Sequence, residues 1–310
     1  MTESTNVKVV VILLTMNQKE KTIRCLKSFG SVISPPCKIV LWDNGSDDGT
    51  AEMVRQEFPD VLVHHHPQNA GVASGRNEAA KIAMKRFNPD YLLFLDNDMT
   101  VTPGFMDALL KPFESERGLA QTTGKIKDMG NHERLYGAGG CRIKFWLGET
   151  GHVGYGEIDR GQYDQQTRCI PSGGCIFVRS DVFQQLGGFD NNFDPYGPED
   201  LDFGLRVVKA GYYGLFVPEA VVFHETRRSR TFEGGRYTEK YAFTRARHWL
   251  FFMNRHASLV QKLGFLFVGA PYLLMILMIR EAKNGNLIVA LKGLFRGALN
   301  FASFSLQGKK

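Results

Sequence analysis

The 310-residue sequence lacks several features that mark non-globular or secreted proteins. Its 33 glycines follow no triplet period, which excludes a collagen-like chain. Its five cysteines are odd in number and include no C-x-x-C pair, so neither a disulfide framework nor a cysteine-rich zinc site is predicted. Residues 1–8 are polar and hold no cleavable signal peptide, and we therefore expect a reducing, cytoplasmic setting.

Charge is distributed unevenly along the chain. The net charge of +6 combines −6 over residues 1–225 with +12 over residues 226–310, where 15 Lys and Arg stand against 3 Asp and Glu. A composition of 43% hydrophobic and 23% charged residues suits a folded body. The basic, aromatic C-terminal region suggests contact with phosphates, of nucleic acid or of a membrane.

Strand and helix patterns alternate three times in the first hundred residues, beginning with an apolar run at 7–14 that is typical of a strand covered on both faces. The alternation predicts an α/β domain with a parallel sheet, in which ligands bind beyond the carboxyl ends of the strands. Asn17, Asp43, Asn69 and Asp96 stand at or just after such ends. Strands are expected at 7–14, 38–42, 61–64, 91–95, 176–178, 213–217 and 221–223, helices at 20–29, 50–58, 73–87, 181–186 and 198–208, and a long loop at 148–164.

The segment Asp96-Asn97-Asp98 directly follows the strand predicted at 91–95. In an extended backbone, residues i and i+2 project to the same side, so the two carboxylates can hold one hard cation, Mg²⁺ or Mn²⁺. Such a cation would neutralise a diphosphate. The alternative is a solvated turn, because Asp-Asn-Asp is ordinary turn composition.

Two further segments follow predicted strands. Asp43 can accept a hydrogen bond from a base N–H, whereas residues 46–50 are typical of a turn and a helix cap. The loop at 69–77 contains Gly71 and enters a helix, where backbone N–H groups favour phosphate. It is neither a P-loop nor a dinucleotide fingerprint. Histidines 64–66 do not predict a metal site, because neighbours on a strand point to opposite faces.

Glu199 and Asp200 begin the helix predicted at 198–208. The helix dipole keeps a carboxylate at this end ionised and ready to accept a proton at neutral pH. The alternative is a charged first helical turn, in which Asp202 pairs with Arg206 at i,i+4.

Between Lys262 and Arg280 lie 17 residues without charge, close to the lower limit for a membrane-spanning helix. Pro271 lies in the middle and would kink a helix, and basic residues on both flanks indicate no orientation for a span. We therefore expect helices that lie in or dip into an anionic leaflet. A buried helix or an oligomer interface is the alternative. Nucleic acid is not expected as a partner, because the aromatic residues here accompany long aliphatic ones.

The order of these motifs resembles the inverting family 2 glycosyltransferases with the GT-A fold, over residues 7–225. The sequence is most similar to the rhamnosyltransferase-like branch that builds bacterial surface polysaccharides, although Met16 stands where that branch often has Tyr. The resemblance implies a Rossmann-like mixed sheet flanked by helices at 1–235, followed by a basic helical region at 236–310. The motifs are V-I-L-L-T-M-N ending at Asn17, D-N-G-S-D-D-G-T at 43–50, N-A-G-V-A-S-G-R-N at 69–77, D-N-D at 96–98, S-G-G-C-I-F-V-R at 172–179, G-G-F-D at 187–190 and E-D-L-D-F-G-L-R at 199–206.

The resemblance also implies roles for single residues. Asp43 would read the base, Asp98 would be the principal metal ligand beside Asp96, and His224 would complete the metal or diphosphate site. The catalytic base would come from Glu199 and Asp200, of which we favour Asp200, with Glu199 supporting it or contacting the acceptor. The implied nucleotide-sugar-binding residues are Thr15, Asn17, Asp43, Asn44, Gly71, Arg76, Asn77, Asp96, Asn97, Gly173, Gly174, Arg227 and Arg228, and the implied ligands of Mn²⁺ or Mg²⁺ are Asp96, Asp98 and His224.

We thus expect a metal-dependent, inverting transferase at the cytoplasmic face of the cell membrane. It would move a sugar from a nucleoside diphosphate, with dTDP-rhamnose or a UDP-hexose favoured, to a hydroxyl of a lipid-linked or growing saccharide. One alternative is a non-catalytic, nucleotide-sugar-binding membrane scaffold. Another is a nucleotidyltransferase, although residues 15–20 do not form the glycine-rich basic loop that this class needs. A homo-oligomer through the helical tail stays open.

Overall fold

The computed structural model describes residues 7–30, 37–225 and 238–307. Its contacts divide the chain into two compact units. The first comprises residues 1–142, 152–195 and 199–226, and the second comprises 143–151, 196–198 and 227–310. Two short segments from within the region expected to be catalytic therefore belong with the C-terminal helices, which the linear order does not reveal.

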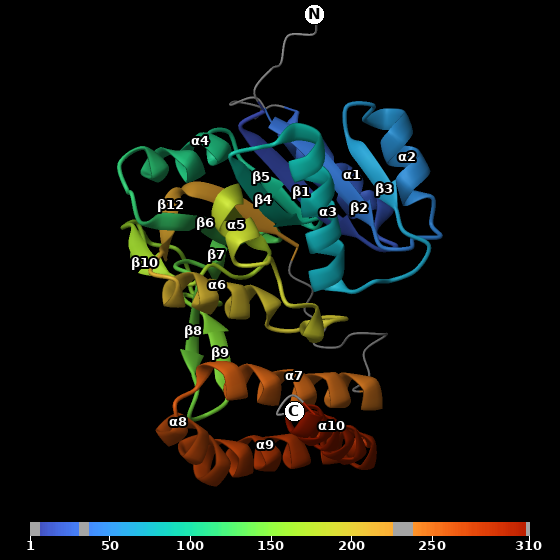
Figure 1. Cartoon of the computed structure of the whole chain (residues 1–310), viewed down its shortest axis with the longest axis vertical. Coiled ribbons are helices and arrows are strands. Elements are labelled where there is room, and N and C mark those ends of the chain that lie inside the picture. Colours follow the sequence, from blue (N-terminus) through green and yellow to red (C-terminus); the bar gives the residue numbers. More distant parts are fainter. Residues whose placement is uncertain (1–6, 31–36, 226–237, 308–310) are drawn as a thin grey trace, which may run out of the picture. The chain divides into compact units, whose positions relative to one another are not determined.

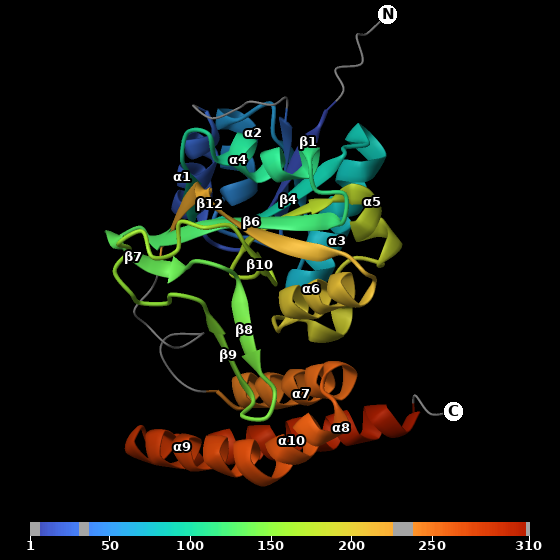
Figure 2. The ribbon, with the colours of Figure 1, turned by 90° about the vertical axis from the view of Figure 1, so that its left-hand side faces the viewer.

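A mixed ten-stranded sheet forms the centre of the first unit (Figures 1 and 2). The strand order is β10-β12-β6-β11-β4-β1-β2-β3, with β5 paired to β12 and β7 paired to β6. Strands β4, β1, β2 and β3 are parallel, whereas β11 is antiparallel to both β4 and β6. The strands are β1 (Val9–Thr15), β2 (Cys37–Asp43), β3 (Leu62–His65), β4 (Tyr91–Asp96), β5 (Met99–Val101), β6 (Leu119–Asp128), β7 (Asn131–Gly137), β10 (Thr167–Cys169), β11 (Cys175–Arg179) and β12 (Tyr213–His224).

Helices cover both faces of this sheet, as the continuous apolar run of β1 predicts. Val9, Val11 and Leu13 point into a core with α1, α2 and α4, while Val10 and Ile12 point into a second core with α3, α5 and α6. All five side chains are buried. These helices are α1 (Lys19–Phe29), α2 (Thr50–Glu57), α4 (Phe105–Leu110), α3 (Val72–Phe87), α5 (Ser180–Gln185) and α6 (Glu199–Lys209).

One strand prediction is wrong in form. The sequence predicts separate strands at 213–217 and 221–223, but the structure has one strand, β12, of 12 residues. Its pairing with β6 shifts register between Val217 and Val221, around Pro218. A β-bulge accommodates the proline there without ending the strand. The long strand matters because it carries His224 to the edge of the sheet where β4 ends.

The second unit consists of the tip of a β-hairpin, β8 (Cys141–Lys144) with β9 (Glu149–His152), and the C-terminal helices. A Cβ atom at Gly293 or Gly297 would lie 2.4 or 2.5 Å from a backbone oxygen of α7, so these glycines allow α10 to pack closely on α7. Leu277 packs with Ala242 and Ala290 in a small core. The helices are α7 (Glu239–His256), α8 (Leu259–Gly264), α9 (Ala270–Lys283) and α10 (Leu287–Gln307).

Helices α8 and α9 join through a π-helical turn at Phe265–Gly269 into one helix, Leu259–Lys283. The Ala270 N–H donates to the Phe265 carbonyl, one residue further back than in an α-helix, immediately before Pro271. The distortion predicted at Pro271 thus takes the form of a π-helical turn. Over the described residues this is the one helix long and apolar enough to cross a membrane. Its most apolar stretch of 18 residues has a mean hydropathy of 2.0, and 11% of that stretch is buried.

Candidate active site

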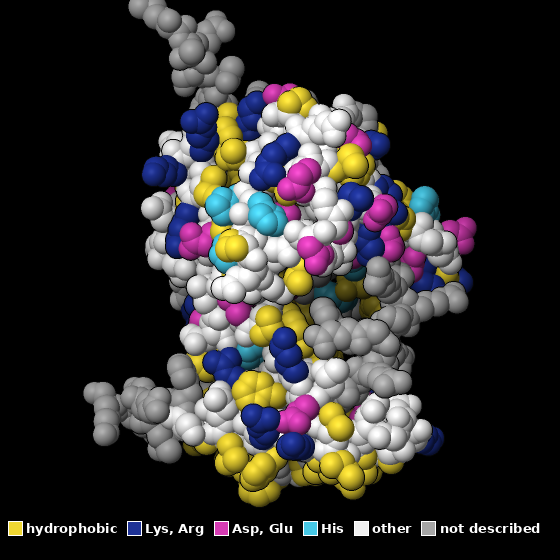
Figure 3. Space-filling view, turned by 90° about the vertical axis from the view of Figure 1, so that its right-hand side faces the viewer, with side chains coloured by type: hydrophobic (Ala, Val, Ile, Leu, Met, Phe, Trp, Pro, Cys, Tyr) yellow, Lys and Arg dark blue, Asp and Glu magenta, His cyan; other side chains and the backbone are white. Residues whose placement is uncertain are grey.

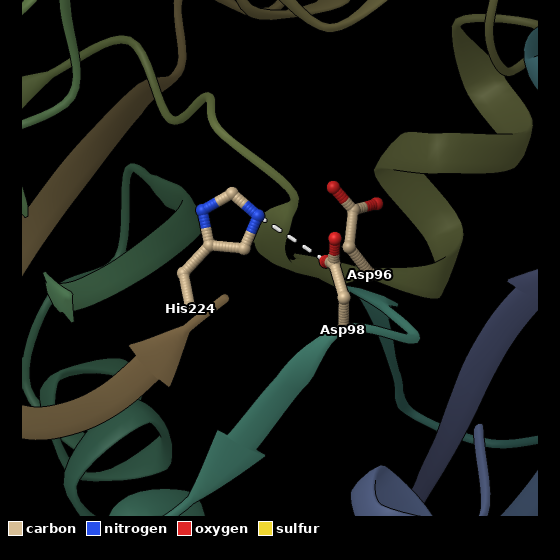
Figure 4. Close-up of side chains that lie close together, drawn as sticks. All are labelled: Asp96, Asp98 and His224. Atoms are coloured by element: carbon tan, nitrogen blue, oxygen red, sulfur yellow. Dashed lines mark ion pairs between the residues drawn. The ribbon is translucent and has the colours of Figure 1, made fainter. Parts of the chain in front are cut away.

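Asp96, Asp98 and His224 come together at one edge of the sheet (Figure 4). Asp96 ends β4, and Asp98 precedes β5, whose residue Met99 pairs with His224 at the end of β12. His224 Nε2 lies 3.2 Å from Asp98 Oδ1. Strand pairing therefore assembles the trio that the family resemblance implied, from positions more than 120 residues apart.

The donor set of this trio suits Mg²⁺ or Mn²⁺. One ligand atom from each residue lies within 4.8 Å of the other two, and opposite ligands of Mg²⁺ are about 4.2 Å apart. Carboxylate oxygens suit either ion, and Mn²⁺ also accepts imidazole. The Nδ1 atom of His224 is buried and has no hydrogen-bond partner among the described residues, whereas Nε2 lies beside Asp98.

A buried lysine, which the sequence did not single out, faces the same carboxylates. Lys21 Nζ on α1 lies 3.5 Å from Asp98 Oδ2 and 3.2 Å from Glu225 Oε1. Burial alone would raise the pKa of Asp98, but the hydrogen bond and charge of His224, with Lys21, outweigh burial and lower it. Burial likewise opposes the charge on His224, whereas Asp98 raises the pKa of that imidazole. Asp98 is therefore held ionised.

Arg76 joins the acidic edge to the first turn of α6. Its Nη2 lies 2.7 Å from Asp96 Oδ1, and its Nη1 lies 3.2 Å from Glu199 Oε1. Burial alone would lower the pKa of Arg76, but the charges of Asp96 and Glu199 raise it overall. Glu199 is itself 5% exposed, so its carboxylate is occupied inside the protein.

Asp200 is partly exposed and lies beside the glycine turn at Gly173–Gly174. Its Oδ2 accepts a hydrogen bond from the Gly173 N–H at 3.3 Å, and its Oδ1 accepts one from the Leu201 N–H at 2.7 Å. Gly174 has φ +82°, and a Cβ there would lie 2.1 Å from Asp96 Oδ2. Only glycine allows the chain to pass between Asp96 and Asp200. The structure thus brings both predicted glycines and both predicted acids together.

An aromatic wall, also missed from the sequence, borders the metal trio. The Tyr136 ring lies edge-on to His224, with ring centroids 4.4 Å apart, and contacts His152 and Tyr155 at 5.0 and 5.7 Å. Burial, with the charge of Asp96, raises the pKa of Tyr136 to about 12, so its hydroxyl keeps its proton. These residues come from β7, β9 and the following turn, and no local pattern marks them.

At the ends of β1 and β4, two predicted nucleotide-binding side chains are used inside the protein. The Asn97 amide donates to the hydroxyls of Thr15 and Thr22, at 3.1 and 2.9 Å, and those two hydroxyls lie 2.8 Å apart. Thr15 and Asn97 are both buried. Their side chains therefore hold the turn beside Asp96 and Asp98.

The ends of β1 and β2 are tied together. The Asn17 N–H donates to the Ser46 hydroxyl, and Asn17 Oδ1 accepts from the Asp47 N–H, both at 2.9 Å. Asn44 Nδ2 donates to Asn69 Oδ1 at 2.9 Å. Asp43 is completely buried at the same end.

The structure contradicts the phosphate site predicted at the start of α3, because the backbone N–H groups expected to bind phosphate donate to the protein instead. The Val72 N–H donates to the Pro195 carbonyl, and the Ala73 and Ser74 N–H groups donate to the Asp194 carboxylate. A carboxylate from the same chain therefore takes the place that the pattern around Gly71 suggested for phosphate.

Asn77, on the same helix, is also engaged within the protein, where its amide binds the backbone of Phe189 and the side chain of Asn191. Arg227 and Arg228, like Arg230, lie outside the described residues.

Comparison with known proteins agrees with this geometry. Residues 10–187, more than half of the chain, match the model of Glycosyl transferase family 2, and residues 162–233 match that of the N-terminal domain of galactosyltransferase. The chain belongs to glycosyltransferase family 2, and it is a transferase of sugars by that membership. This finding also sets aside the nucleotidyltransferase alternative.

The chain is also similar in sequence to individual glycosyltransferases. The chain is 28% identical over 236 residues to N-acetylglucosaminyl-diphospho-decaprenol L-rhamnosyltransferase of Mycobacterium tuberculosis, covering 71% of this chain and 76% of the relative. It is 27% identical over 228 residues to the glycosyltransferase AglE of Haloferax volcanii, covering 71% and 67%.

Two solved structures share the fold. GalNAc-T7 with UDP, GalNAc and Mn²⁺ has a TM-score of 0.60 at 19% identity, covering 76% of this chain and 46% of that one. The mannosyltransferase PcManGT from Pyrobaculum calidifontis, with GDP-Man and Mn²⁺, has a TM-score of 0.56 at 16% identity, covering 99% and 81%. The fold is therefore GT-A, as the motif order implied.

Proposed function

We propose that this chain is an inverting glycosyltransferase that moves a sugar from a nucleoside diphosphate to a hydroxyl of a lipid-linked or growing saccharide. The observation that carries the proposal is the meeting of Asp96, Asp98 and His224 with Asp200 across the turn at Gly173–Gly174. Similarity to a rhamnosyltransferase favours dTDP-rhamnose as donor, with a UDP-hexose as the alternative. The lipid diphosphate in that relative's name favours a lipid-linked acceptor.

Asp96, Asp98 and His224 would hold Mn²⁺ or Mg²⁺, which supplies positive charge to the leaving diphosphate when bound. Asp200 takes the proton of the acceptor hydroxyl while the acceptor oxygen bonds to the anomeric carbon. The bond from that carbon to the diphosphate oxygen breaks on the opposite face, so the configuration inverts. Asp200 suits this task because it is partly exposed, whereas Glu199 is buried against Arg76 and positions it.

The nucleotide is proposed to lie along the carboxyl ends of β4, β1 and β2. Asp96 and the turn at Gly173–Gly174 would meet the diphosphate and ribose, with Arg76 holding Asp96. The base would lie toward β2. Thr15, Asn17, Asp43, Asn44 and Asn97 stand at or next to these strand ends, while Arg227 and Arg228 stay predicted as diphosphate contacts.

The second unit is proposed to lie on an anionic membrane surface, at the cytoplasmic face. Gly269, Leu277 and Glu281 are the buried side of the long helix, and its other sides expose apolar residues without a charge between Lys262 and Arg280. Since one stripe packs on protein, a helix lying in the interface fits better than a lone span. Hydrophobic side chains gather along the lower edge of this unit in Figure 3. Between Lys262 and Arg280 the most exposed large hydrophobic residues are Leu266, Phe267, Val268, Met275 and Ile279.

Calorimetry of the full chain with a panel of nucleotide sugars and Mn²⁺ tests the donor site. We expect one donor to bind, with binding lost on chelation and in Asp98→Ala but kept in the exposed control Asp47→Asn. Asp200→Asn should bind that donor yet lose transfer and donor hydrolysis by at least about 100-fold. Equal turnover by wild type and Asp200→Asn would contradict the assigned base.

The same experiment addresses the scaffold alternative. Donor binding without any hydrolysis or transfer, to acceptors that include polyprenyl-diphosphate sugars, would favour a non-catalytic binder. No donor binding by folded protein would reject the donor site itself.

Flotation with vesicles tests the membrane proposal. The chain should float with phosphatidylglycerol-containing vesicles and less with pure phosphatidylcholine. Phe267→Glu, at a side chain 73% exposed, should reduce flotation, whereas Val208→Glu, 48% exposed on α6, should not. Equal flotation of the two variants, or oligomers that form without lipid and are lost in Phe267→Glu, would contradict it.

A further inference from the structure

The turn of the β8–β9 hairpin carries three apolar residues in a row, Phe145, Trp146 and Leu147. Gly148 follows them with φ +69°, and its N–H donates to the Lys144 carbonyl at 3.0 Å, which closes the turn. Glycine adopts this conformation without the strain that a side chain would add. Turns are ordinarily built from polar residues, so the apolar run at this turn indicates a surface for contact.

The turn lies directly against two helices of the second unit (Figure 2). A Cβ atom at Gly269 would lie 2.5 Å from the Trp146 carbonyl oxygen and 2.9 Å from the Leu147 carbonyl carbon, so glycine lets the turn approach the long helix. On the other side, Phe145 stacks on Phe252 of α7, with ring centroids 5.8 Å apart. The backbone of the turn is therefore fixed on the protein.

The Trp146 side chain is nevertheless 50% exposed, and its indole N–H has no hydrogen-bond partner among the residues that the structure describes. A Cβ atom at Gly264 would lie 3.3 Å from the Trp146 Cβ. Residues three or four apart are neighbours on a helix surface, so Val260 and Phe267 flank this position. Their side chains are 78% and 73% exposed. Trp146 therefore stands at the border of the exposed apolar face of the long helix.

The chemistry around Trp146 fits a lipid surface. Residues 141–152 hold the exposed Arg142 and Lys144 against one acid, Glu149, and Lys262 stands on the helix near Gly264. Basic residues are attracted to anionic headgroups. Tryptophan gathers at membrane–water interfaces, because its ring has an apolar body and one polar N–H.

We propose that Trp146 anchors the hairpin turn in the headgroup region of an anionic membrane, at the edge of the long helix. The inference rests on the proposed function, in which the long helix meets the same membrane, and adds a contact made by the hairpin. Strand β9 leads from this turn to His152, whose ring contacts Tyr136 in the aromatic wall. The anchor holds this hairpin at the surface in which a lipid-linked acceptor is embedded.

Tryptophan fluorescence of the full chain with phosphatidylglycerol vesicles tests the position of the ring. Trp146→Phe keeps an aromatic ring but removes the reporter, so the difference between wild-type and variant emission separates Trp146 from Trp42 and Trp249. On vesicle binding this difference emission should move to shorter wavelength. Lipids brominated near the headgroup should quench it more strongly than lipids brominated near the end of the acyl chain.

Vesicle partitioning of two glutamine variants measures what the contact contributes. Trp146→Gln removes the apolar ring without adding charge and should weaken partitioning by at least about fivefold, because roughly half of a tryptophan side chain loses its apolar contact. Thr150→Gln places the same residue at an exposed position of the same hairpin and should leave partitioning unchanged. Thermal unfolding confirms that both variants are folded.

Two results would overturn the inference and leave the contact of the long helix intact: vesicle-bound wild type with unquenched Trp146, or equal partitioning of Trp146→Gln and Thr150→Gln. A dimer that forms without lipid and is lost in Trp146→Gln would assign the ring to a second copy and also overturn it. Folded wild type that binds no vesicles would overturn both the inference and the proposed membrane contact. Donor binding, measured by calorimetry without lipid, tests the transferase proposal separately.

Discussion

Arg76 and Glu199 form a buried ion pair, with Nη1 and Oε1 3.2 Å apart, between two helices that are 123 residues apart in sequence. The other arm of the same guanidinium holds Asp96 at 2.7 Å. This pair distinguishes the two acids at the start of α6. Glu199 is committed to Arg76, and Asp200 is left at the surface of the site.

Replacement of Arg76 tests this division. Arg76→Met should lower the free energy of unfolding by about 3 kcal/mol, because it leaves the buried Glu199 carboxylate unpaired. The double variant Arg76→Met/Glu199→Gln should regain part of that stability but not metal-dependent donor binding, since Asp96 stays unsupported. Denaturant unfolding and calorimetry measure the two effects. Recovery of donor binding in the double variant would show that Arg76 does not position Asp96.

A methyl group at Gly174 should disable the metal site. In Gly174→Ala the new Cβ would lie 2.1 Å from Asp96 Oδ2, so Asp96 must move. Gly187→Ala is the matched control, since Gly187 also has positive φ, +74°, but a methyl group there would have no described heavy atom within 4 Å. Both variants should lose about 1 kcal/mol of stability from backbone strain. Only Gly174→Ala should lose Mn²⁺ binding, followed by electron paramagnetic resonance, and equal Mn²⁺ affinities would contradict the arrangement.

The close packing of α10 on α7 predicts a local loss of stability. In Gly297→Leu the Cβ would lie 2.5 Å from the Phe243 carbonyl oxygen, and separating the helices should cost about 2 kcal/mol. Hydrogen exchange at the amides of α7 and α10 should quicken by more than tenfold. Ala302→Leu, at an exposed position of the same helix, should leave exchange unchanged. Similar exchange in both variants would rule out a packing role for Gly297.

Acid should weaken the attachment of the loop after β9 to β6. Burial alone would raise the pKa of Asp159, but hydrogen bonds from Lys127, the Gly161 N–H and Lys125 lower it overall. A lowered folded-state pKa adds stability above the unfolded pKa of about 3.9, and this stability is lost as pH falls through the folded value. Asp159→Asn should therefore be less stable than wild type at pH 7, with the gap closing below about pH 4. A gap in urea midpoints that is equal at pH 7 and pH 3 would contradict this.

The local parts of the site could be predicted because their chemistry is encoded in adjacent residues. Asp96 and Asp98 share a side of an extended segment, and Glu199 and Asp200 begin a helix, so both pairs are visible without tertiary structure. His224 has no such local signal, and only the resemblance to a family suggested it. Lys21 and Tyr136 were missed because a lone lysine or tyrosine carries no spacing that marks its partner.

The phosphate prediction at Gly71 failed for a related reason. The pattern of a glycine loop entering a helix shows where N–H groups are free of helical partners, and it does not show what fills them. Asp194, more than 120 residues away, accepts two of these hydrogen bonds.

The sequence by itself determined the alternation of strands and helices, the buried central strand, the acidic pairs and the apolar C-terminal helix. Each depends on hydrophobic periodicity or on residues close along the chain. Tertiary structure alone decided that β12 continues past Pro218 to bring His224 to Asp98, and that Arg76 takes Glu199. These outcomes depend on strand order and on side-chain packing between segments that are distant in sequence. Local sequence patterns do not encode which of these segments meet.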